Sequence, residues 1–223
     1  MKYFNIFFLA AILSCSNNHE SEQFENLQRI DLGEIESDNI LEASGLASSR
    51  FNQNILWTHN DSGDSNRIFA MDINGNHVGE FLLNNTENRD WEDIAIGPGP
   101  MEGVDYIFVG DIGDNRSEND VKHIYRFAEP QVYTDNQSSE INIDNIESIS
   151  YQYEDGNRDA ESLIVDPITK DIIIISKREE SAVHVYLLPF PHDTENILTA
   201  QLIMTKDFYP NINFNTSQWI VAG

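Results

Sequence analysis

Short apolar runs and short polar turns alternate along most of this chain. Runs of about four to eight residues with a period of two, bounded by Gly, Pro, Asn and Asp, are typical of β-strands. No helical period of useful length is visible, so the pattern predicts an all-β fold. The predicted strands form three successive units of four, near 42–48, 54–60, 67–73 and 77–83, then 90–96, 105–111, 122–128 and 145–153, then 159–165, 171–177, 183–188 and 200–207.

A short motif led by a carboxylate opens each unit. Its copies are Glu42-Ala-Ser-Gly-Leu-Ala, Asp90-Trp-Glu-Asp-Ile-Ala and Asp159-Ala-Glu-Ser-Leu-Ile. A repeat the size of a whole sheet is typical of solenoids and β-propellers. The second strand of each unit is the most apolar, as expected for a strand covered on both faces. We therefore predict a β-propeller built from four-stranded antiparallel blades.

The predicted propeller is an incomplete ring. Known propellers have about four to eight blades, whereas this sequence accounts for about three blades plus a start. That start is the segment 217–223, which looks like the beginning of another first strand. A strand-like segment at 27–35 precedes the first blade and is suited to closing a last blade. We expect residues 27–223 to form a partial propeller domain whose remaining blades would follow Gly223.

Several strings in the chain resemble those of a group of exported bacterial β-propellers, which are similar to the phytase-like and gluconolactonase-like propellers. The resemblance covers about residues 40–190 and implies a propeller fold, but no settled activity. The strings are Glu42-Ala-Ser-Gly-Leu-Ala-Ser-Ser-Arg50, Leu56-Trp-Thr-His-Asn-Asp-Ser-Gly63, Asp90-Trp-Glu-Asp-Ile-Ala95, Val109-Gly-Asp-Ile-Gly-Asp-Asn115, Ile124-Tyr-Arg-Phe-Ala-Glu-Pro130 and Asp159-Ala-Glu-Ser162.

The N-terminus carries the features of an export signal. Lys2 is followed by an apolar run of about ten residues, which falls short of the roughly 20 needed to cross a bilayer. Ile12-Leu13-Ser14-Cys15 resembles the lipobox of bacterial lipoproteins, and a buried core cysteine is the alternative. We predict a signal peptide at 1–14, an acylated, palmitate-bearing Cys15 and a polar tether at 15–26. The resemblance implies a lipid anchor in the outer membrane of the bacterial cell envelope, because Ser16 follows the cysteine.

The chain is strongly acidic. It has 38 Asp and Glu residues against 13 Lys and Arg residues, for a net charge of −25. Nucleic acid and anionic membrane surfaces are therefore excluded as favourable partners. Most of these carboxylates are expected to form a solvated surface, while a subset could gather cations.

The strongest candidate chemistry lies at one end of the predicted sheets. In an antiparallel pair the start of the first strand lies beside the end of the second, so the motif acids share one rim of the propeller with the residues that close the second strands. Oxygen ligands at this density suit Ca²⁺ better than Zn²⁺. The alternative is that these side chains cap loops by accepting backbone N–H bonds. The predicted cation ligands are Asp61, Glu92, Asp111 and Glu161, and the predicted ligand-binding residues are Asn60, Lys177 and Arg178.

Two classes of function remain open. One is a binding module whose rim engages a small molecule, a glycan or a protein. The other is a metal-assisted hydrolase of an ester, lactone or phosphoester, of the phytase-like or lactonase-like kind. His59 is the histidine nearest the rim, as a structural residue or a general base. Serine-hydrolase and nucleotide motifs are absent from the sequence. Fold analogy does not choose between the two classes, and we favour the binding module.

Overall fold

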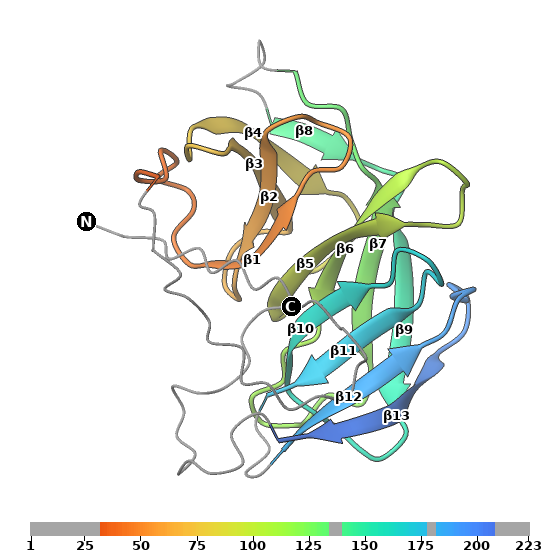
Figure 1. The fold of residues 1–223 in the computed structure, drawn as a ribbon. Helices are drawn as coiled ribbons and strands as arrows, with labels where there is room; N and C mark the ends of the chain where they lie inside the picture. The colour runs from red at the N-terminus through yellow and green to blue at the C-terminus, as the bar shows by residue number, and fades with distance from the viewer. Residues whose placement is uncertain (1–31, 134–139, 178–181, 208–223) are drawn as a thin grey trace, which may run out of the picture.

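The described part of the chain, residues 32–133, 140–177 and 182–207 of a computed structural model, consists of β-strands joined by turns and loops (Figure 1). The all-β prediction is therefore confirmed at the level of fold class. Within these residues, no helix is long and apolar enough to cross a membrane. The predicted signal peptide, Cys15, the tether, Arg178 and the segment 217–223 lie outside the described residues.

All twelve strands predicted for the three units are present within two residues of their expected bounds. The first unit contains β1 (Ala43–Ser48), β2 (Ile55–Asn60), β3 (Arg67–Asp72) and β4 (His77–Leu83). The second contains β5 (Trp91–Pro98), β6 (Asp105–Asp111), β7 (Lys122–Ala128) and β9 (Glu147–Tyr153). The third contains β10 (Ala160–Val165), β11 (Ile172–Ser176), β12 (Val183–Leu188) and β13 (Leu198–Lys206). The part of the strand-like segment 27–35 that is described, from Leu32 onward, lies in no strand.

One strand, β8 (Glu140–Ile143), was not predicted. It lies in the polar segment 129–144, between β7 and β9. It pairs in parallel with β4, and its Ile141 and Ile143 pack against the apolar core of the first unit. Two apolar residues spaced two apart, Ile141 and Ile143, therefore suffice for this otherwise polar segment to form a strand at the edge of the sheet.

The strands form two sheets rather than three separate ones. The five-stranded sheet has the order β1-β2-β3-β4-β8, and the eight-stranded sheet has the order β10-β11-β12-β13-β9-β7-β6-β5. Neighbours within each unit are antiparallel. The second and third units are joined because the start of β13 pairs in parallel with the end of β9. Thus β4 and β9, the outer strands of the first two units, each pair in parallel with a strand that belongs to a later part of the chain.

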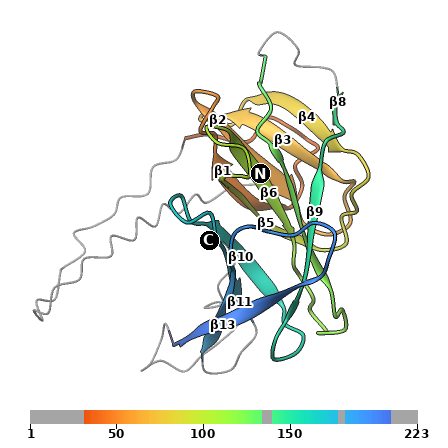
Figure 2. The same cartoon turned by 90° about the vertical axis from the view of Figure 1, so that its right-hand side faces the viewer.

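The eight-stranded sheet curls until its two edge strands, β5 and β10, contact each other, so that it is nearly closed and barrel-like (Figures 1 and 2). Strand β1 of the other sheet also contacts β5. The first strands of all three units therefore lie side by side, which brings the three copies of the acidic motif together.

Two apolar cores support this arrangement, and β6 contributes to both. Ile107 and Val109 pack with the first unit, around Trp57 and Phe81. Tyr106 and Phe108 face the other way and pack with the third unit inside the curled sheet. Because successive side chains of a strand point to opposite faces, a continuous apolar run is what a strand buried on both sides requires.

Candidate cation-binding site at the starts of the first strands

Each first strand contains a β-bulge within the acidic motif. In β5, pairing with β6 passes from Trp91–Asp111 directly to Asp93–Gly110, which leaves Glu92 as the extra residue. A bulge breaks the alternation of side chains and turns the extra residue in a new direction, and bulges are frequent beside functional sites.

The other two first strands repeat this feature. In β10, pairing with β11 passes from Ala160–Ser176 to Ser162–Ile175, so Glu161 is the extra residue. In β1 the register shifts between Ala43 and Leu46. The same local irregularity therefore recurs at the same motif position in all three units.

These bulges bring five carboxylates together in two overlapping groups. Asp61, Asp90 and Glu92 can each offer one oxygen within 4.8 Å of the others, and Glu92, Asp159 and Glu161 can do the same. Glu92 belongs to both groups. Glu92, Asp159 and Glu161 are buried, whereas Asp61 and Asp90 are half-buried. The cluster thus has an inner part, shielded from solvent, and an outer part that solvent reaches.

Burial, together with the neighbouring negative charges, raises the pKa of three acids of the cluster, Glu92, Glu161 and Asp90. Burial raises the pKa of Glu92 far above its usual range, and the charges of Glu161, Asp61 and Asp90 add to this effect. Burial also raises the pKa of Glu161, although Lys177 opposes the shift. The pKa of Asp90 is raised by burial and then by Asp61 and Asp159. Without a cation, the cluster therefore retains protons at a pH where isolated carboxylates would be ionised.

Lys177 is a basic residue beside the cluster, and its ammonium group forms an ion pair with Glu161. Lys177 in the third unit and Asp61 in the first unit occupy equivalent backbone positions. The N–H of Asp61 donates to the carbonyl of Glu42 at 2.9 Å, and that of Lys177 donates to the carbonyl of Asp159 at 3.0 Å. One backbone position therefore provides an acid in the first unit and a base in the third. Lys177, a predicted ligand-binding residue, therefore lies beside the clustered acids.

Gly113, in the loop after β6, packs directly against the acids. Its N–H donates to the carbonyl of Asp90 at 3.1 Å. A Cβ at this position would overlap the carboxylates of both Asp90 and Glu92. Only a glycine lets the loop backbone approach the two carboxylates so closely.

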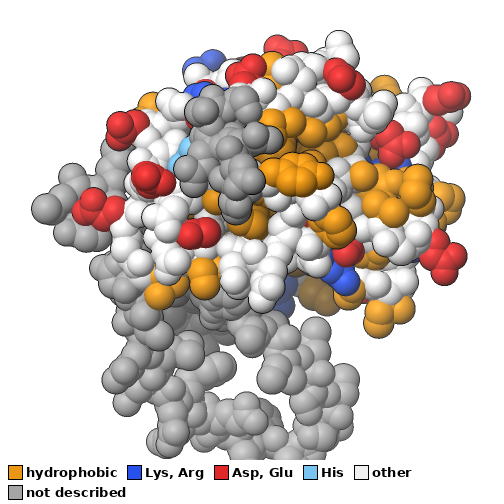
Figure 3. Space-filling model, turned by 90° about the horizontal axis from the view of Figure 1, so that it is seen from above, with side chains coloured by type: hydrophobic (Ala, Val, Ile, Leu, Met, Phe, Trp, Pro, Cys, Tyr) orange, Lys and Arg blue, Asp and Glu red, His pale blue; other side chains and the backbone are white. Residues whose placement is uncertain are grey.

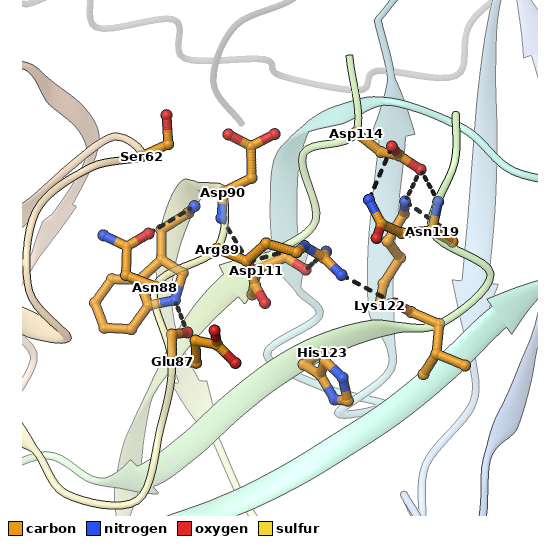
Figure 4. Close-up of polar contacts among 12 residues, drawn as sticks. Ser62, Glu87, Asn88, Arg89, Asp90, Asp111, Asp114, Asn119, Lys122 and His123 are labelled. Carbon is orange, nitrogen blue, oxygen red and sulfur yellow. Dashed lines mark hydrogen bonds and ion pairs between the residues drawn. The ribbon is translucent and has the colours of Figure 1, made fainter. Parts of the chain in front are cut away.

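The next residue of the loop contacts the third unit. The N–H of Asp114 donates to Oδ1 of Asp159 at 2.7 Å. The carboxylate of Asp114 points the other way, toward Lys122 and Asn119 (Figure 4). The loop between β6 and β7 therefore touches acids from both the second and the third unit.

Asp111 and Asn60 hold the starts of the first strands. Oδ1 of Asp111 accepts from the N–H of Asp90 at 2.8 Å and lies 3.8 Å from Nε of Arg89 (Figure 4). Oδ1 of Asn60 accepts from the N–H groups of Leu41 and Glu42 in the first unit. Both side chains thus make the loop-capping contacts that were the alternative to ligand binding. Among the described residues, Asp111 is in neither of the two carboxylate groups.

His59, the histidine candidate, is packed into the structure. His59 is buried, its Nδ1 lies 2.8 Å from the carbonyl of Asn60, and its ring meets Trp91 edge to face. Burial lowers the pKa of His59 to about 4, so the imidazole is neutral at physiological pH. Trp57 and Trp91 are fully buried in the core. These properties favour a structural role for His59.

The structure therefore brings together three of the four predicted cation ligands, Asp61, Glu92 and Glu161, and adds Asp90 and Asp159. The sequence did carry a signal for the two additional acids, because each is the first residue of its motif copy. The contribution of Gly113 had no comparable signal. It depends on a close approach between a loop and side chains from another strand.

Acidity alone does not distinguish this cluster from the rest of the molecule. Acidic side chains are dispersed over the face shown in Figure 3, where Lys and Arg are few. The distinguishing properties are burial, convergence from three units and the close packing of Gly113.

No protein-family model matches this sequence, and no curated protein matches it at a significant level. The resemblance to exported β-propellers therefore stays a prediction, and the functional interpretation rests on the geometry of the site.

Proposed function

We propose that this protein is a lipid-anchored, exported β-propeller module that binds a divalent cation, Ca²⁺ by preference, and presents it to a ligand at the rim. The ligand would be a small molecule, a glycan or a protein. The propeller assignment is supported by three four-stranded antiparallel units whose first strands lie side by side and whose apolar cores lie between successive units.

One observation carries the cation proposal: five carboxylates from three units converge, and Glu92 belongs to both groups. Charges of one sign repel unless protons or a cation lie among them. Ca²⁺ takes about six to eight oxygen ligands in a flexible geometry, whereas Zn²⁺ favours nitrogen and sulfur ligands. A donor set made only of carboxylates and backbone groups fits Ca²⁺. Asp61, Asp90, Glu92, Asp159 and Glu161 would hold the cation.

A binding role is favoured over hydrolysis because of the position of Lys177. A hydrolase of anionic esters would need a basic group free to bind the substrate, and Lys177 is already paired with Glu161. A buried ion pair loses much of its stabilisation when one partner is withdrawn. Among the described residues, which do not include Arg178, the metal-assisted hydrolase therefore has no supporting contact beyond the acids themselves.

Location in the cell envelope is proposed from the leader and Cys15. A lipid anchor followed by a polar tether would hold the module at the membrane while leaving its rim accessible.

Calorimetric titration with Ca²⁺ tests the proposed function. We expect the wild-type protein to bind Ca²⁺ and to melt at a higher temperature when Ca²⁺ is present, because a ligand bound by the native state alone stabilises it. Glu92→Gln and Glu161→Gln should each weaken binding. Glu102→Gln, a change of an exposed acid between β5 and β6, should leave it unaltered. Absence of heat and of a melting shift in the wild-type protein would contradict the proposal.

A further inference from the structure

Lys122 is a fully buried lysine at the start of β7 and is not one of the residues proposed to hold the cation. Its Nζ lies 2.5 Å from Oδ2 of Asp114 and 3.2 Å from the carbonyl oxygen of Asn119 (Figure 4). Buried lysines are rare and are tolerated when they are paired and hydrogen-bonded. The position of this charge therefore calls for a structural or functional reason.

Asp114, the partner of Lys122, organises the loop between β6 and β7. Its carboxylate accepts hydrogen bonds from the N–H of Glu118 at 3.0 Å and from the N–H of Asn119 at 2.9 Å. It also accepts from Nδ2 of Asn119 at 3.0 Å. These bonds fold the loop around the Asp114 carboxylate, and Lys122 fixes that carboxylate to the sheet.

The opposite side of the same loop supports the carboxylate cluster. Gly113 donates to the backbone of Asp90 and packs against the carboxylates of Asp90 and Glu92. The N–H of Asp114 donates to the carboxylate of Asp159. One loop therefore contacts three of the five clustered acids. Among the described residues, Lys122 is the buried lysine that holds this loop to the sheet.

We propose that Lys122 is a positioning residue of the cation site: it acts through Asp114 and the loop backbone to hold Asp90, Glu92 and Asp159 in a ligating arrangement. This inference rests on the proposed function, since it names a residue that supports the same site. Groups that orient the residues holding a metal contribute to affinity without touching the metal, and their removal weakens binding about 10- to 100-fold.

The same strand provides a matched control. Arg126 of β7 is also buried, and its guanidinium donates to Oε2 of Glu147 at 2.7 Å and 2.9 Å. Its Nη1 lies 3.2 Å from Nδ1 of His192, and it is four residues further along β7 than Lys122, away from the loop between β6 and β7. Lys122→Met and Arg126→Met each remove one buried positive charge from β7. Both should lower stability, but only the first removes the anchor of the loop.

The decisive experiment combines Ca²⁺ titration with amide hydrogen exchange. We expect Lys122→Met to weaken Ca²⁺ binding at least about tenfold and to speed exchange at the amides of Gly113 and Asp114. Arg126→Met should leave both readouts within about twofold of the wild-type values, since it keeps the loop anchor. Equal behaviour of the two variants in affinity and exchange would overturn the proposal.

A second variant covers the case in which Lys122→Met does not fold. Asp114→Ala breaks the same link from the loop side and should have the same two effects. The double variant should be no weaker in Ca²⁺ binding than either single variant, because the two side chains act as one unit. Additive losses would show independent roles and would overturn the proposal.

The two readouts also separate this inference from the proposed function. Failure of the wild-type protein to bind Ca²⁺ would remove the cation module. The exchange comparison between Lys122→Met and Arg126→Met would then decide alone whether Lys122 holds the loop against the acids.

Discussion

The carboxylate of Asp93 in β5 accepts a hydrogen bond from the backbone N–H of Leu163 in β10 at 2.8 Å. These two strands are the opposite edges of the eight-stranded sheet. The other oxygen of Asp93 accepts from the N–H of Ile94 at 2.9 Å, and the side chain is almost completely buried. A single side chain therefore bridges the edges of the curled sheet, directly beside the bulged residue Glu92.

Asp93→Ala should destabilise the protein by about 1–3 kcal/mol, because it leaves the buried N–H of Leu163 without its partner. Urea denaturation measures this loss as a lower midpoint at an unchanged slope. Asp193→Ala, which removes an exposed turn-capping acid, should cost less than about 1 kcal/mol. Equal midpoints for the two variants would show that the bridge contributes nothing.

The carboxylate cluster should make the cation-free protein less stable as pH rises. The folded-state pKa of Glu92 lies above its ordinary value of 4.5, so the folded protein binds more protons than the unfolded chain above that pH. Stability then falls with rising pH until the folded pKa is passed. Melting temperatures in EDTA should fall from about pH 5 to about pH 8, a range that lies above the ordinary pKa of Glu92 and below its raised pKa in the folded protein.

Glu92→Gln should flatten that pH profile, since the substituted side chain does not titrate. Glu102→Gln should keep the wild-type slope. Saturating Ca²⁺ should also flatten the profile, because a bound cation takes the place of the protons. A Glu92→Gln profile as steep as that of the wild-type protein would mean that the pH dependence arises elsewhere.

Gly113→Ala should weaken Ca²⁺ binding by at least about tenfold, because the added methyl group would push the loop away from Asp90 and Glu92. Gly79→Ala is a suitable control. Its added Cβ meets only the edge of the Phe81 ring, in the first unit. Titration calorimetry should therefore find the wild-type affinity in Gly79→Ala, and finding it in Gly113→Ala would argue against the close approach.

Lipidation is predicted at Cys15, which lies outside the described residues. Cys15→Ala should abolish incorporation of a fatty-acid analogue and release the protein from the membrane fraction, whereas Ser16→Ala should retain the label. Labelling that persists in Cys15→Ala would rule out this residue as the acylation point.

The strands were predictable because period-two patterning and turn residues are local signals, and β6 with its apolar run is an example. The parallel pairing of β8 with β4 was not, because it depends on which sheet edge is available to a short segment. The convergence of acids from the starts of the first strands and the ends of the second strands was predictable from antiparallel geometry. The role of each acid was not predictable. Asp111 caps the Asp90 backbone, whereas Asp90 joins the cluster, and this difference depends on side-chain directions that a bulge changes.

Because of the bulges, the residues at the site can differ without changing the residues that pack the sheets. A residue outside the pleat alternation can be exchanged without moving its apolar neighbours to the wrong face. The three copies carry Ser44, Glu92 and Glu161 at this motif position, and Ser44 donates to the backbone of Glu92 at 2.7 Å rather than adding a charge. In related chains, single substitutions at these positions would therefore change the charge of the proposed cation site on an unaltered scaffold.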